Sequence, residues 1–81
     1  MVRLNRAVAV WKLQGPEASL AMIDPLKSEL EAYFYFHGLR GTLLKELHRF
    51  DEARDALNRA IALAKSVAEA KLIRRELDRL A

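Results

Sequence analysis

Residues 37–65 read HGLRGTLLKELHRFDEARDALNRAIALAK, and this stretch decides the fold. Apolar residues recur every three or four positions on both sides of His48–Phe50, which predicts a helix, a tight turn and a second helix. Small residues stand where the two helices would touch: Gly41 on the first, and Ala53, Ala56 and Ala60 on the second. The stretch therefore predicts a helical hairpin whose helices cross closely at Gly41.

The composition of the chain is that of one small folded domain. Its 81 residues are 52% hydrophobic, which is too apolar for a disordered segment. The chain has no cysteine, so disulfides and thiolate metal sites are excluded. The longest apolar run near the N-terminus, Ala7–Trp11, is too short for a signal peptide or a membrane span. We expect a soluble, cytoplasmic protein.

Helical periodicity continues on both sides of the hairpin. Helices are expected over residues 2–13, 16–24, 29–47, 51–65 and 67–80. Gly15–Pro16 should separate the first two, because proline suits the first position of a helix. Pro25 disfavours helical geometry at the residue before it, which predicts a break near residues 26–28. Asp51 is expected to cap the fourth helix.

The side chains that these helices bury follow from the same spacing. The second helix is expected to bury Ala18, Ala21 and Met22, and the last helix should place Ala70, Ile73, Leu77 and Leu80 on one stripe.

The two halves of the chain are similar in pattern. GPEASLAM at 15–22 aligns with FDEARDAL at 50–57, an offset of 35, and the preceding helices align at an offset of 36. A period near 34 residues is typical of tetratricopeptide repeats. The sequence therefore predicts an all-α, tetratricopeptide-like helical hairpin array. Its single domain, 1–81, would contain hairpins 2–26 and 29–65 and a capping helix 67–80.

Four segments also resemble a particular family. They are VRLNRAVAV (2–10), GPEASLAMID (15–24), residues 33–64 and IRRELDRL (73–80), with His37, Arg40, Leu43 and Leu44 opening the second hairpin. This pattern resembles the C-terminal tetratricopeptide-like extension of a subgroup of bacterial extracytoplasmic-function sigma factors. The family's turn glycine is replaced by His48, and the regions that bind core polymerase and promoter lie outside these residues. The resemblance implies a regulatory role in transcription initiation. The implied partner is the sigma regions of a longer protein or an RNA polymerase-associated factor.

Five residues are candidates for contact with a partner: Phe34, Tyr35, Arg40, Leu4 and Trp11. The consecutive aromatics from Tyr33 surround a helix, so Phe34 or Tyr35 should be exposed. Arg40 lies on a buried stripe, where it would contact a partner or form an ion pair with Asp51, Glu52, Asp55 or Glu17. Leu4 and Trp11 belong to the first helix, and we expect no earlier helix to cover them. A second copy could cover them, which predicts a twofold dimer.

The sequence contains weaker evidence for other functions. His37 and His48 are too isolated to predict a metal site, and no phosphate loop, nucleophile motif or acid pair indicates an enzyme or a cofactor. Lys71, Arg74, Arg75 and Arg79 share one helix face, but Asp78 should pair with Arg74 there. We therefore expect a noncatalytic protein-interaction module. The alternative is a small basic nucleic-acid-binding helical domain.

Overall fold

The computed structural model describes residues 2–80, with side chains from Leu4 onward. The elements are α1 (Val2–Gln14), α2 (Pro16–Ile23), the 3-10 helix η1 (Asp24–Leu26), α3 (Phe34–Glu46), α4 (Phe50–Leu63) and α5 (Val67–Asp78). The expectation of an all-α fold is confirmed over this part of the chain. None of the described helices is long and apolar enough to cross a lipid bilayer.

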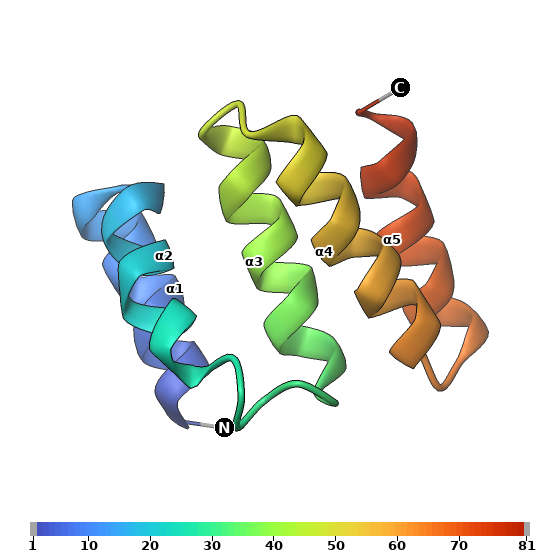
Figure 1. The fold of residues 1–81 in the computed structure, drawn as a ribbon, viewed down its shortest axis with the longest axis horizontal. Coiled ribbons are helices and arrows are strands. Elements are labelled where there is room, and N and C mark those ends of the chain that lie inside the picture. Colours follow the sequence, from blue (N-terminus) through green and yellow to red (C-terminus); the bar gives the residue numbers. More distant parts are fainter. Residues whose placement is uncertain (1, 81) are drawn as a thin grey trace.

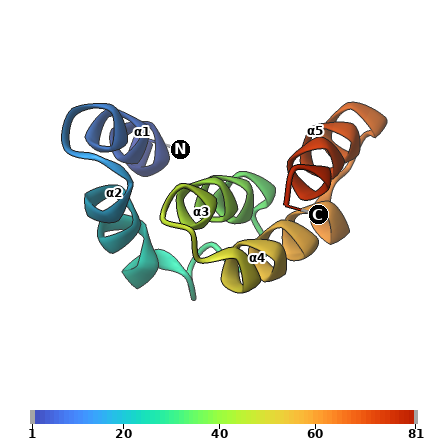
Figure 2. The ribbon, with the colours of Figure 1, turned by 90° about the horizontal axis from the view of Figure 1, so that it is seen from above.

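The helices form two layers. α1 pairs with α2, α3 pairs with α4, and α5 lies beside α4 (Figure 1). Every extensive contact joins α-helices that are consecutive along the chain, or α2 and the 3-10 helix that follows it. Seen from above, α1, α3 and α5 line the hollow side of an arch, and α2 and α4 lie behind them (Figure 2). The three helices of the hollow side run in the same direction (Figure 1).

In both helical hairpins, the two helices contact each other at small residues. A Cβ atom at Gly41 would lie 2.6 Å from Cγ and Cδ2 of Leu57, so only glycine fits the α3–α4 crossing without a shift. In the first hairpin the crossing residue is Ala7, which is fully buried. The hydroxyl of Ser19 donates a hydrogen bond to the Ala7 carbonyl at 2.7 Å. The predicted crossing at Gly41 is confirmed.

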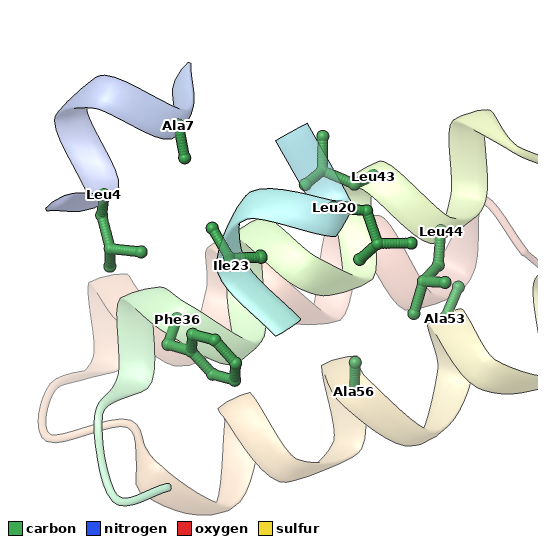
Figure 3. Close-up of a cluster of buried hydrophobic side chains, with 9 residues drawn as sticks. All are labelled: Leu4, Ala7, Leu20, Ile23, Phe36, Leu43, Leu44, Ala53 and Ala56. Atoms are coloured by element: carbon green, nitrogen blue, oxygen red, sulfur yellow. The ribbon is translucent and has the colours of Figure 1, made fainter. Parts of the chain in front are cut away.

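The core runs between the two hairpins (Figure 3). Its main cluster is Leu4, Ala7, Leu20, Ile23, Phe36, Leu43, Leu44, Ala53 and Ala56. A second cluster of Phe34, Leu57, Ala60 and Ile73 seats α5 on α3 and α4. Ile73 is the buried member of the predicted α5 stripe, and Ala70, Leu77 and Leu80 are half-buried.

The buried face of α2 differs from the expectation. Ser19, Leu20 and Ile23 are buried, whereas Ala21 is exposed and Ala18 and Met22 are only half-buried. This rotation of the helix puts leucine and isoleucine into the core in place of two alanines, which removes more apolar area from water. It also allows the Ser19 hydroxyl to reach the Ala7 carbonyl.

The corrected face changes the repeat offset. The expected offset of 35 would pair buried Ala56 with exposed Ala21. An offset of 34 instead pairs buried positions with each other: Ala7 with Gly41, Ser19 with Ala53, and Ile23 with Leu57.

The start of α3 was expected at Glu29, and this is wrong. The break after Pro25 is present, but turns continue through Ala32, and α3 begins at Phe34 after an extended Tyr33 (ψ 115°). The His37 ring donates from Nε2 to the Glu31 carbonyl at 2.7 Å, which holds the turn against α3. That bond satisfies a backbone acceptor that the missing helical turn would otherwise have paired.

The cap of α4 also differs from the expectation. α4 begins at Phe50, so Arg49 occupies the cap position without a side-chain cap bond, and Asp51 lies in the first turn. Arg49 donates two hydrogen bonds to Glu52, at 2.6 and 2.9 Å, and these hold the pKa of the Glu52 carboxyl below its ordinary value. His48 turns the chain with φ 60°, a conformation that glycine adopts more readily.

A candidate protein-interaction groove

The hollow side of the arch contains a groove of about 800 Å³. It is lined by residues of α1, α3 and α5. Figure 2 shows α3 lying between α1 and α5 on the hollow side of the arch. Most of the lining is apolar or aromatic. A concave, largely apolar surface of this size is the usual form of a binding site.

The lining residues repeat along the chain. Each of the three helices contributes the same four positions, spaced i, i+1, i+4 and i+7. They are Leu4, Asn5, Val8 and Trp11 on α1; Gly38, Leu39, Thr42 and Lys45 on α3; and Leu72, Ile73 and Glu76 on α5, with Arg79 as the residue that caps its C-terminus. Each set lies 34 positions after the preceding one, as the numbers of Leu4, Gly38 and Leu72 show. The groove is therefore one repeated surface presented three times.

One end of the groove is aromatic and apolar. Tyr33, Phe34 and Tyr35 lie at the start of α3, with the ring centroids of Phe34 and Tyr35 5.0 Å apart in an edge-to-face arrangement. Tyr35 is 53% exposed and Leu72 is 51% exposed. Exposed tyrosine and leucine side chains at the mouth of a groove can be buried by the apolar surface of a partner.

The opposite end combines Trp11 with charged side chains. Lys45 of α3 forms an ion pair with Glu76 of α5 at 2.5 Å, and Arg79 pairs with the other oxygen of the same carboxylate at 3.0 Å. The Arg79 side chain remains 61% exposed. Glu46 also lines this end and is exposed.

Four of the five predicted partner-contact residues line this groove. Leu4, Trp11, Phe34 and Tyr35 come together there. Tyr35, and not Phe34, is the exposed aromatic, because Phe34 turns into the α5 cluster and is 7% exposed. Leu4 is buried in the main cluster, contrary to the expectation that α1 would leave it uncovered.

Arg40 lies outside the groove. It donates from Nε to Asp24 Oδ1 at 3.0 Å, so the predicted internal ion pair forms, but with a partner that the sequence analysis did not name. Asp24 is the first residue of the 3-10 helix η1, which follows directly after the end of α2.

Several lining residues were not predicted from the sequence, including Leu39, Leu72 and the Lys45–Glu76 pair. Steps of 34 positions along the chain would have found them: two steps from Leu4 and Val8 reach Leu72 and Glu76, and one step from Asn5 and Trp11 reaches Leu39 and Lys45. Among the described side chains, Arg74 and Asp78 do not form the expected ion pair. No group of three His, Cys, Asp or Glu residues in that part of the chain could hold a metal ion.

Comparison with known proteins finds one informative similarity. The chain is 62% identical over all of its 81 residues to an uncharacterized protein of Rhizobium meliloti, and it spans 19% of that protein's length. No protein-family model and no solved structure matches the chain. The similarity thus relates these residues to one segment of a much longer protein.

Proposed function

We propose that the chain is a tetratricopeptide-like array that acts as a noncatalytic protein-interaction module, with the groove as its binding surface. The observation that carries this proposal is the 34-residue register of the groove, in which three helices contribute the same four positions. A 34-residue unit of two helices is the tetratricopeptide period, and stacked helical repeats use their concave side for binding.

The ligand in this proposal is a segment of the longer protein to which such a module belongs. The Rhizobium relative has about four-fifths of its length outside the matched region, which supports a partner in the same chain. The resemblance of LNRAVAV and the His37–Leu44 segment to a sigma-factor extension supports a regulatory role in transcription initiation, in the cytoplasm.

The chemistry of the groove favours binding over reaction. Its charged groups are largely paired with each other, as Lys45 and Arg79 are with Glu76. Apart from Asn5, Thr42 and Glu46, the remaining lining is apolar and aromatic, the composition of the buried centre of a protein–protein contact.

Isothermal titration calorimetry would test the proposal. The purified chain is titrated into the Rhizobium meliloti protein from which the matching segment has been deleted. Binding is expected, and Leu72→Asp should weaken it by about tenfold or more, which corresponds to about 1.4 kcal/mol. Val67→Asp is the matched control, because Val67 is an exposed apolar residue of the same helix outside the groove. The absence of binding, or an equal loss in both variants, would refute the proposed function.

A further inference from the structure

We propose that the groove takes a single amphipathic α-helix that runs antiparallel to α1, α3 and α5 and is acidic in its first turn. The helix would come from the part of the longer protein outside the matched segment. This inference rests on the proposed function and specifies the ligand.

The form of the ligand follows from the hydrogen bonds that the groove can offer. Its apolar end presents aromatic rings and Leu72, and the hydroxyl of Thr42 on the floor already donates to the Gly38 carbonyl at 3.0 Å. Beyond the Asn5 amide and the tyrosine hydroxyls, the lining has few partners for the backbone of an extended peptide. Much of that backbone would be buried unpaired, which is costly. A helix satisfies its own backbone and presents only side chains. Helix-in-groove binding is therefore the favoured mode.

The direction of the ligand follows from the three parallel lining helices. Their N-termini lie at the aromatic end, and their C-termini lie at the end with Lys45 and Arg79 (Figure 1). The partial positive charge of each helix dipole is therefore at the aromatic end, and the negative charge is at the other. An antiparallel ligand helix opposes these dipoles, as α2 and α4 already do. Its N-terminus would lie beside Lys45 and Arg79.

The acidic residue follows from unequal pairing at that end. Glu76 is shared by Lys45 and Arg79, so two cations have one carboxylate between them. Both retain hydrogen-bond donors, because an ammonium group has three and a guanidinium has five. Glu46 lies on the rim of the groove and forms no ion pair with Lys45 or Arg79 within the described part of the chain. A carboxylate in the first turn of the ligand would meet these donors and also suits a helix N-terminus.

The length of the buried segment follows from the volume. A helix about 10 Å wide that rises 1.5 Å per residue occupies roughly 120 Å³ per residue, so 800 Å³ accommodates roughly seven residues, or two turns. One acidic side chain and apolar side chains at i+3 or i+4 and i+7 would fill it.

The test uses Trp11, the only tryptophan of the chain, which lines the groove. The chain is labelled with 5-fluorotryptophan and mixed with peptides that tile the rest of the Rhizobium meliloti protein. A peptide with an acidic first turn and helically spaced apolar residues should shift the fluorine resonance and become helical on binding, as seen by circular dichroism. Proline at its centre should weaken binding by about a hundredfold, because proline breaks a helix.

Two arginines one turn apart provide the charge test. Arg79→Glu should lower the affinity for the peptide about tenfold. Replacing the acidic residue of the peptide by lysine should restore binding to this variant. Arg75→Glu is the control, because Arg75 is exposed on the same helix but lies outside the groove. The inference would be overturned if the central proline left the affinity of the peptide unchanged. It would also be overturned if Arg79→Glu and Arg75→Glu lowered that affinity equally. Binding of the segment-deleted protein but of no peptide would overturn it too, whereas failure of that protein to bind would overturn the proposed function itself.

Discussion

The crossing of α3 and α4 allows a sharp test of the packing, through the substitution Gly41→Ala. The new Cβ would lie 2.6 Å from two carbon atoms of Leu57, about 1 Å inside the ordinary carbon–carbon contact distance of roughly 3.5 Å. Leu57 is fully buried, so its side chain has no free space to enter. Overpacking of this kind costs about 1–3 kcal/mol. Alanine offsets about 1 kcal/mol of this through its better helix propensity.

The expected net loss of unfolding free energy is therefore about 1 kcal/mol, which lowers Tm by about 4–8 °C in a domain of this size. Gly38→Ala, one turn earlier, is the matched control. Its Cβ would lie 3.4 Å from Cδ1 of Ile73, an ordinary contact with the end of a flexible side chain. That variant should gain up to about 1 kcal/mol from helix propensity alone.

The same substitution in a Leu57→Ala variant isolates the contact between residues 41 and 57. In Leu57→Ala the colliding atoms are gone, so adding Gly41→Ala should now stabilise the protein by up to about 1 kcal/mol. Urea unfolding followed by circular dichroism, at a temperature where Leu57→Ala remains folded, gives both free energies. If Gly41→Ala is as stabilising as Gly38→Ala in the wild-type background, or costs the same with and without Leu57, the packing argument is refuted.

Three further predictions concern the charged and polar surface. Ser66→Ala should cost about 1 kcal/mol in thermal unfolding, because the Ser66 hydroxyl accepts from the Glu69 amide at the start of α5. The pKa of Glu52, followed by NMR, should lie below its ordinary value and rise in Arg49→Ala. Because the folded pKa is depressed, the stabilising contribution of this pair is present above the unfolded pKa and is lost as pH falls through the folded one. Arg74→Ala should leave duplex DNA binding unchanged in fluorescence anisotropy; tight, salt-sensitive binding that this variant weakens would support the nucleic-acid alternative instead.

The helices were largely predictable from local signals. Gly15–Pro16 fixed the boundary between α1 and α2, and the apolar spacing of residues 50–63 located α4. The start of α3 was not predictable in this way, because Glu29–Ala32 have good helix propensity. Their turn conformation depends on a tertiary hydrogen bond from His37 to Glu31.

The groove was only partly predictable. Leu4, Trp11, Phe34 and Tyr35 were recognisable as large apolar residues without obvious cover. The positions that complete the groove change chemistry from one repeat to the next: tryptophan on α1 becomes lysine on α3 and arginine on α5. The residue types therefore do not indicate the 34-residue spacing of the groove positions. The spacing is recognised only from the arrangement of the three helices. Because the wrong face of α2 was expected to be buried, the expected offset was 35 residues and not 34, so the repeated groove positions could not be aligned.

The pairing of consecutive helices has a consequence for how the chain folds. Because each extensive contact joins neighbours along the sequence, little loop entropy must be lost before native contacts form. Proteins with such local contacts fold on the order of microseconds to milliseconds. During synthesis each helix can dock on the one that emerged before it, so α1 and α2 can pair while α5 is still within the ribosome. The order of the elements along the chain is thus also a feasible order of assembly.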